Sequence, residues 1–132
     1  MCICPVRISS TPLSARNEAT FFHSFIFASP TRSKAGTEGM MGPDVTILDR
    51  NHKFDRTDIP IGRQGNTERK PTVIEDDVWI GCQVLIMPGR RIRKGSIIAG
   101  GCVLCKDFPE YSIVGGNPSK LIRSRKEEVK KE

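Results

Sequence analysis

The sequence predicts an all-β protein whose main body is a parallel β-helix, a coil built from short strands. The first observation is a branched apolar residue at every sixth position over one long stretch, namely Ile74, Ile80, Ile86, Ile92, Ile98 and Leu104. A six-residue period fits neither the 3.6-residue period of an α-helix nor the two-residue alternation of a strand. It is typical of β-helices, in which each six-residue unit forms one side of a coil and points its apolar residue inward.

The fifth position of the same six-residue unit is the second observation. It is mostly small or apolar, with Val78, Val84, Ser96, Cys102 and Phe108, and Arg90 is the departure. The 12 glycines and 9 prolines are the third observation, because the corners of such a coil need tight turns. Each buried apolar side chain contributes about 1.5–3 kcal/mol, which is ample to hold the stacked units in register.

The repeat divides the 132 residues into three segments of a single domain. Residues 1–40 lie outside the readable repeat, residues 41–109 form the β-helix, and residues 110–132 form a closing strand, a turn and a charged tail. Within the β-helix, residues 53–72 are polar and turn-rich, so we expect them to leave the coil as one long loop. Loops of this length are uncommon in compact domains, and a functional role is therefore expected for it.

Composition argues against several classes of function. The net charge is +6, but the few aromatic residues are not interleaved with the basic ones, so no nucleic-acid surface is expected. No apolar run reaches the roughly 20 residues of a membrane span. Arg7, Pro5 and Pro12 interrupt any signal-peptide core, so a cytoplasmic protein is expected. The five cysteines lack disulfide or zinc-ligand spacing, which favours reduced thiols and no metal site.

Residues 41–125 resemble the hexapeptide-repeat acyltransferases, and among them the sugar O-acetyltransferases that act on galactosides, maltose or colanic acid. Four motifs carry the resemblance: NHKF at 51–54, VIEDDVWIG at 73–81, MPGRRIRKGSIIAGGCVLCKD at 87–107 and YSIVGGNPSKLIR at 111–123. The resemblance implies a left-handed coil and a homotrimer that binds acetyl-CoA between neighbouring subunits. It also implies direct transfer of the acetyl group to a hydroxyl of a sugar or polysaccharide precursor.

The same resemblance assigns roles to individual residues. His52 matches the catalytic histidine, and an imidazole with an ordinary pKa of about 6.5 can accept the proton of an attacking hydroxyl. Trp79, the only tryptophan, is expected to line the site, with packing against the loop or a neighbouring subunit as the alternative. The residues that match cofactor-binding positions are Cys82, Gly100, Cys105, Lys106, Lys120 and Arg123. Cations suit the phosphates of coenzyme A, glycine lets a ligand approach the main chain, and no thiol chemistry is implied.

Other interpretations of the sequence stay open or are rejected. One is a truncated, non-catalytic β-helix scaffold that still binds coenzyme A, since residues 1–40 show neither the N-terminal helix of the family nor readable hexapeptides. Transfer to an amine in place of a hydroxyl stays open, because the chemistry is the same. A zinc hydratase of the carbonic-anhydrase type is rejected, because it needs three histidines and the chain has two. The acceptor is not specified by the sequence.

Overall fold

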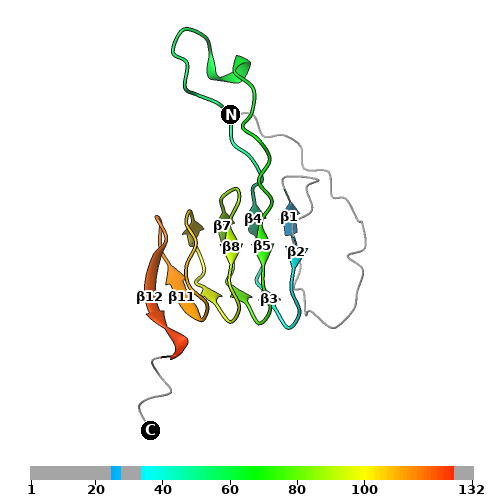
Figure 1. Ribbon diagram of the computed structural model, residues 1–132, viewed down its shortest axis with the longest axis vertical. Coiled ribbons are helices and arrows are strands. Elements are labelled where there is room, and N and C mark those ends of the chain that lie inside the picture. The colour runs from blue at the N-terminus through cyan, green and yellow to red at the C-terminus, as the bar shows by residue number, and fades with distance from the viewer. Residues whose placement is uncertain (1–24, 28–33, 127–132) are drawn as a thin grey trace.

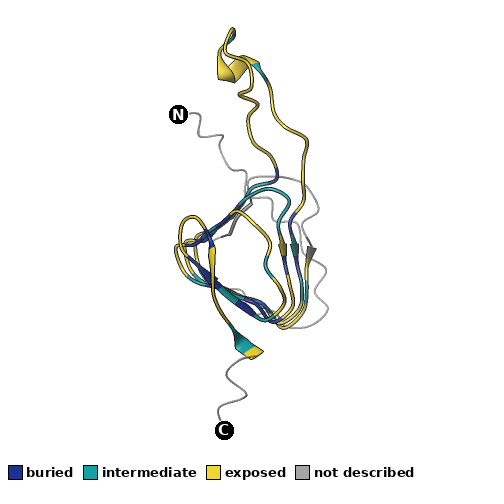
Figure 2. Cartoon of the chain, turned by 60° about the vertical axis from the view of Figure 1, so that its left-hand side comes forward, coloured by how far each residue is buried: buried dark blue, intermediate teal, exposed yellow. Residues whose placement is uncertain are grey.

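The computed structural model describes residues 25–27 and 34–126 of the chain. In this part of the chain, short strands stack in parallel on three sides of a coil (Figure 1). Figure 2 shows the three sides, with a long arm that leaves one corner. The prediction of an all-β protein built as a parallel β-helix is therefore confirmed. Among the described residues, no helix has the length and apolar character needed to cross a membrane.

Each side of the coil is one sheet. The first sheet contains β1 (Phe25–Phe27), β4 (Val45–Ile47), β7 (Leu85–Ile86) and β10 (Val103–Leu104). The second sheet contains β2 (Lys34–Ala35), β5 (Val73–Ile74) and β8 (Arg91–Ile92). The third sheet contains β3 (Met40–Met41), β6 (Trp79–Ile80), β9 (Ile97–Ile98), β11 (Ser112–Gly115) and β12 (Lys120–Ser124). The chain thus visits the three sheets in turn, one hexapeptide per side.

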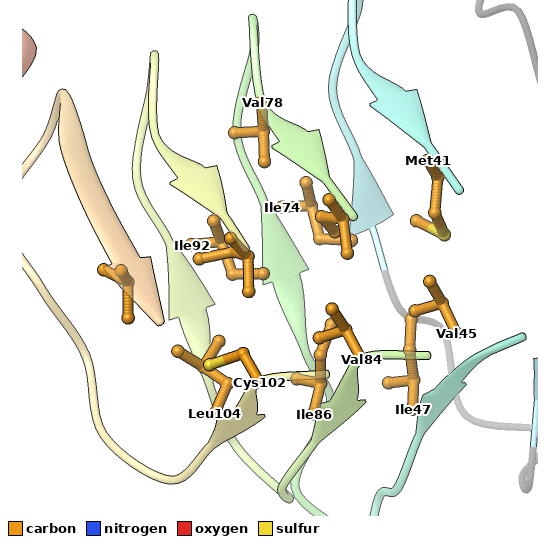
Figure 3. Packing of buried hydrophobic residues seen from close by; sticks show 13 residues of the cluster. Met41, Val45, Ile47, Ile74, Val78, Val84, Ile86, Ile92, Cys102 and Leu104 are labelled. Atoms are coloured by element: carbon orange, nitrogen blue, oxygen red, sulfur yellow. The ribbon is translucent and has the colours of Figure 1, made fainter. Parts of the chain in front are cut away.

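The strand register matches the sequence repeat. Ile74 pairs with Ile92 on the second sheet and Ile80 pairs with Ile98 on the third, one full coil later in each case. All six of the predicted inward positions are buried, with exposed fractions of 8% or less. Because the same residue type recurs on each side, the side chains form continuous columns inside the coil (Figure 3).

The fifth positions behave as predicted, and the structure accounts for the exception. Val78, Val84, Ser96 and Cys102 are buried, and Phe108 packs against the core. Arg90 is not a core residue, since a quarter of its side chain (25%) remains exposed. Its guanidinium donates to the carbonyl oxygen of Cys105 at 3.0 Å, in the corner of the next coil. The hydrogen bond between corners takes the place of apolar packing at this position.

The coil extends N-terminally beyond residue 41, where the readable repeat begins. Strands β1, β2 and β3 pair in parallel with β4, β5 and β6, so residues before 41 contribute to all three sheets. Ala35 pairs beside Ile74 and lies six residues before Met41, which continues the spacing. Alanine has little apolar surface and Gly39 occupies the fifth position, so the repeat is hard to recognise there. The other residues of the 1–40 segment lie outside the described residues.

The excursion between β4 and β5 is an arm, residues 48–72, that projects away from the coil (Figures 1 and 2). Its two strands meet at an antiparallel bridge between His52 and Asn66, and a short 3-10 helix, η1 (Ile61–Arg63), lies near its tip. The Gln64 side chain holds the tip together. Its amide oxygen accepts from the Arg56 N–H at 3.0 Å, and its amide nitrogen donates to the carbonyls of Arg56 at 2.7 Å and Ile59 at 3.1 Å. The arm is therefore ordered largely by its own hydrogen bonds.

The C-terminal extension folds back over the last coil. Strand β11 continues the parallel stack beside β9, and β12 then returns antiparallel to β11. Arg125 donates to the carbonyl oxygen of Gly95 at 2.6 Å and lies 3.4 Å from the Asp77 carboxylate. The Arg125 guanidinium and the Lys126 ammonium both lie over the Tyr111 ring, at 5.9 and 4.7 Å from its centroid. These contacts hold the end of β12 against the corner that joins the second and third sheets.

Candidate functional site

His52 stands in a two-stranded stem at the base of the arm. The Lys53 N–H donates to the Gly65 carbonyl at 3.0 Å, and the Thr67 N–H donates to the Asn51 carbonyl at 2.8 Å. These two bonds bracket the pair of His52 and Asn66, which is thus a non-hydrogen-bonded pair of the antiparallel ladder. His52 is exposed, and the stem is attached to the corner between the first and second sheets. The sequence predicts a histidine at this exit from the coil, but not its partner strand.

The residues that match cofactor-binding positions occupy two corners and the C-terminal strand. Cys82 and Gly100 lie in the corner between the third and first sheets, where the Gly101 N–H donates to the Cys82 carbonyl at 2.9 Å. Cys105 and Lys106 follow β10, in the corner column from which the arm also leaves. Both corners border the first sheet. The structure therefore places these four residues at the two opposite edges of the first sheet, and His52 in the arm that leaves from one of those edges.

The outer face of the first sheet lies between those two corners. Thr46, Leu85 and Val103 pair across this face and are half-buried, while their neighbours Ile86 and Leu104 point into the core. The face is thus an apolar strip with a threonine at one end. Main-chain and polar groups of the two corners flank it.

Ser119 connects the C-terminal turn to Cys105. The Cys105 N–H donates to the Ser119 Oγ at 3.2 Å, and the Cys105 Sγ lies 3.3 Å from the same oxygen. The hydrogen bond with Ser119 lowers the pKa of the exposed Cys105 thiol, whereas burial raises the pKa of the Cys102 thiol. Ser119 is buried and directly precedes Lys120, so this contact fixes where β12 begins. Ser119 is not among the residues predicted from the sequence, although it lies in the GGNPSK motif.

Trp79 and Arg123 lie on the third sheet, as does Lys120 at the start of β12. Trp79 is 50% exposed and pairs with Met40 on one side and Ile97 on the other. Arg123 lies on β12 opposite Ile113. The third sheet faces away from the corner that carries the arm. Within one chain, the structure does not bring Trp79 and His52 together.

Much of the basic cluster in residues 90–94 forms ion pairs and hydrogen bonds within the coil. Arg91 forms an ion pair with Glu75 at 2.7 Å, and Arg90 lies 3.7 Å from Asp107. The Glu75 carboxylate also accepts the Lys94 N–H at 2.8 Å. That bond, followed by the bond from Arg91, lowers the pKa of Glu75. Lys106, which follows β10, and Lys120, the first residue of β12, are both exposed. The Lys106 ammonium lies 5.7 Å from the centroid of the Phe108 ring.

Gly81 explains why the corner beside Cys82 is so narrow. A Cβ on Gly81 would lie 2.6 Å from the main-chain nitrogen of Gly100, closer than side-chain carbons come to such atoms. Glycine at 81 therefore lets successive coils approach each other.

In the described part of the chain, no group of three or more histidine, cysteine, aspartate or glutamate side chains is arranged to hold a metal ion.

The sequence and the structure of this chain are similar to those of known hexapeptide-repeat proteins. Residues 71–106 match the bacterial transferase hexapeptide model (six repeats). The chain is 34% identical over 88 residues to the galactoside O-acetyltransferase of Lactococcus lactis, an alignment that covers 67% of this chain and 41% of the relative. The maltose O-acetyltransferase of Clostridium difficile has a similar structure, with a TM-score of 0.61 and 33% identity over 69% of this chain and 48% of that one.

A hexapeptide-repeat acetyltransferase of Vibrio cholerae, solved with acetyl coenzyme A, is also similar. Its TM-score is 0.58 and its identity 33%, over 67% of this chain and 49% of that one. The chain thus spans less than half the length of each of these three proteins. The repeat, the stacked coils and these similarities show that the chain is a left-handed β-helix like that of the hexapeptide-repeat acetyltransferases, with residues 71–106 matching the bacterial transferase hexapeptide model.

Proposed function

We propose that this chain transfers an acetyl group from acetyl-CoA to a hydroxyl of a sugar or polysaccharide precursor, with His52 as the general base. The observation that carries the proposal is the gathering of His52, Cys82, Gly100, Cys105 and Lys106 along the borders of the first sheet. Similarity to a maltose O-acetyltransferase and to an acetyltransferase solved with acetyl-CoA supports both the reaction and the co-substrate.

Acetyl-CoA fits the first sheet by its chemistry. The pantetheine arm is an extended chain with amide groups, and it would lie along the half-buried Leu85 and Val103 with corner main-chain groups beside it. The phosphates would lie toward Lys106 and Lys120, since exposed cations suit phosphate oxygens. We expect Arg123, which lies on β12, to supply a further cation for the phosphates. Cys82 and Cys105 contribute main-chain atoms, and no acyl-cysteine is formed.

The reaction is a direct transfer. As the acceptor hydroxyl attacks the thioester carbonyl, His52 removes its proton, and the C–O bond forms as the carbonyl oxygen becomes an oxyanion. Main-chain N–H groups can stabilise that oxyanion. When the intermediate collapses, the C–S bond breaks and the thiolate takes the proton from the imidazolium. The products are the acetyl ester and coenzyme A, and His52 returns to its neutral form.

A homotrimer accounts for the outer face of the third sheet. Met40 and Trp79 are 54% and 50% exposed there, and they form a row with the half-buried Ile97. A row of exposed apolar side chains is stabilised by burial against another subunit. In this arrangement Trp79 of one subunit would face the site of its neighbour. Sedimentation equilibrium of the full chain tests it, with three times the chain mass expected and a monomer as the contrary result.

The test of the activity is coenzyme A release from acetyl-CoA across a panel of sugars, with wild type beside His52→Ala. Coenzyme A is quantified by chromatography, because the exposed Cys82 and Cys105 would react with a colorimetric thiol reagent. We expect release that depends on the acceptor and a loss of about 10²–10⁴-fold in His52→Ala. If coenzyme A binds but no acceptor supports turnover, the proposal is wrong and the chain is a binding scaffold.

A further inference from the structure

The stem of the arm sets the position of His52 relative to one particular residue. In a non-hydrogen-bonded antiparallel pair the two Cα atoms are only about 4.5 Å apart, and the two side chains extend from the same face of the ladder. His52 and Asn66 form such a pair. Asn66 is therefore the cross-strand neighbour of the imidazole, although fourteen positions of chain separate the two residues.

The register of this pair is fixed by Thr67. Its Oγ1 accepts the Asn51 N–H at 3.0 Å and lies 3.2 Å from the Asn51 carbonyl oxygen, which also accepts the Thr67 N–H. A shift of one residue would break all of these bonds and turn Asn66 to the opposite face. On the other side of the pair, the bond from Lys53 to Gly65 closes the ladder. The stem thus holds Asn66 beside His52 with bonds that involve neither side chain.

The geometry points to Asn66 as the positioning residue for His52, an inference that rests on the proposed function. The amide oxygen of asparagine and the Nδ1 of histidine each lie two bonds beyond Cβ, so a side-by-side pair can join them by a hydrogen bond. Among the described residues, the two side chains form no hydrogen bond in this structure. In the proposed arrangement they rotate together, the Asn66 oxygen accepts the Nδ1 proton, and the neutral ring is held in the Nδ1–H tautomer. Nε2 is then the unprotonated atom, and it faces the acceptor hydroxyl.

An amide suits this role better than a carboxylate would. A neutral acceptor selects the tautomer without placing a negative charge beside the imidazole. The charged residues that flank the pair along the stem are Arg50 and Lys53 on one strand and Glu68 on the other, all exposed. Their effects on the imidazole are weakened by solvent and salt, so the residue opposite His52 dominates.

Nuclear magnetic resonance of the full chain labelled with ¹⁵N-histidine tests the inference without relying on activity. The nitrogen shifts distinguish the two neutral tautomers, and the spectrum of His52→Gln assigns the signals of the two histidines. We expect the Nδ1–H tautomer to dominate in the wild type and the Nε2–H tautomer, usual for a free imidazole, in Asn66→Ala. A wild-type spectrum dominated by Nε2–H, or one unchanged in Asn66→Ala, overturns the inference.

Asn66→Asp and a matched control separate a direct contact from a general change of charge. The aspartate keeps the acceptor and adds a charge, so the pKa of His52 should rise and the Nδ1–H tautomer should remain in the neutral form. Asn51→Asp adds the same charge next to His52 but on the other face of the stem, and the bonds of Asn51 in the stem are made by its main chain. A rise as large in Asn51→Asp as in Asn66→Asp contradicts a specific pairing.

Kinetics then connect the pair to the reaction. Asn66→Ala should lower kcat by about 10- to 100-fold with little change in KM, because misplacement of a reacting group costs rate more than binding. Asn66→Asp should restore part of the rate and move the acidic limb of the pH profile upward. If the resonances respond as expected but His52→Ala keeps its activity, the pairing stands and the proposed function fails. If His52→Ala is inactive while Asn66→Ala is fully active with an unshifted profile, Asn66 does not position the base.

Discussion

The hydroxyl of Ser119 receives the main-chain N–H of Cys105 at 3.2 Å and lies 3.3 Å from its sulfur, although fourteen residues separate them in sequence. One buried oxygen thus serves the main chain and the thiol of the same residue. It joins the turn that precedes β12 to a corner of the β-helix. The bond also affects the reactivity of Cys105, because it favours the thiolate form.

Ser119→Ala should slow the alkylation of Cys105. The hydrogen bond lowers the pKa of this exposed thiol, so its loss raises the pKa and reduces the fraction of thiolate at neutral pH. Iodoacetamide labelling followed by peptide mass spectrometry measures the rate at Cys105. Cys82, which is also exposed, is the internal control and should keep its rate. Unchanged labelling of Cys105 would mean that Ser119 does not influence the thiol in solution.

Ile86→Ala should destabilise the fold by about 2–5 kcal/mol, because it leaves a cavity in a fully buried column. Leu85→Ala removes a similar volume from the adjacent, half-buried and outward position, and a smaller loss is expected there. Urea denaturation followed by circular dichroism gives both values. Equal losses for the two variants would contradict the inward and outward assignment of β7.

Gly81→Ala should also be destabilising, by about 1–3 kcal/mol, since the added Cβ would press on the main chain of Gly100. Gly62→Ala is the control, because a Cβ there meets no atom within 4 Å. The difference between the unfolding free energies of the two variants measures the cost of the Cβ in the narrow corner. A Gly81→Ala variant as stable as the wild type would show that successive coils can separate at no cost.

The hydrogen bonds that the Glu75 carboxylate accepts from the Lys94 main chain and from Arg91 should make part of the stability depend on pH. The pKa of Glu75 is lowered in the folded state, so the unfolded carboxyl binds its proton at a higher pH than the folded one. The contribution is therefore present above the ordinary glutamate value of about 4.3 and is lost as the pH falls through the folded pKa. Urea midpoints of Glu75→Gln and wild type should differ at pH 7 and converge at low pH. A gap that persists unchanged in acid would assign the effect to packing.

Lys106→Ala should raise the KM for acetyl-CoA by about tenfold and leave kcat nearly unchanged, because one charge-assisted contact to a phosphate is lost. Arg123→Ala is expected to behave in the same way. Arg63→Ala, an exposed cation of η1, removes the same charge far from the first sheet and serves as the control. Loss of kcat with an unchanged KM would place Lys106 at the reacting atoms instead of the phosphates.

Much of the coil could be predicted because the apolar residue of each hexapeptide marks the position that points into the core. Ile80 and Ile98 meet the same environment one coil apart, so the same residue type recurs and the period is visible. Ala35 lies in register with the inward-pointing Ile74, but it is small and exposed, so the repeat is not visible there. Arg90 departs from the pattern because its bond to the Cys105 carbonyl depends on the next coil, which a local pattern does not reveal.

The sequence predicts individual candidate residues for the site but not their arrangement. His52 could be chosen from its motif, whereas its pairing with Asn66 depends on main-chain hydrogen bonds across the arm. Such bonds have no side-chain signature in the sequence. Ser119 was missed for a similar reason, since its partner is a main-chain N–H in another segment. The sequence therefore does not predict pairings that depend on main-chain hydrogen bonds.

The antiparallel direction of β12 has a consequence for the exposed edge of the third sheet. A stack of parallel strands exposes a row of unpaired N–H and C=O groups at its last coil, to which further strands of the same kind can add indefinitely. On the third sheet, β12 covers that row in the antiparallel sense. A strand that runs against the coil offers the wrong hydrogen-bonding pattern for another parallel hexapeptide. On this sheet β12 thus blocks the edge to which a further parallel hexapeptide could add.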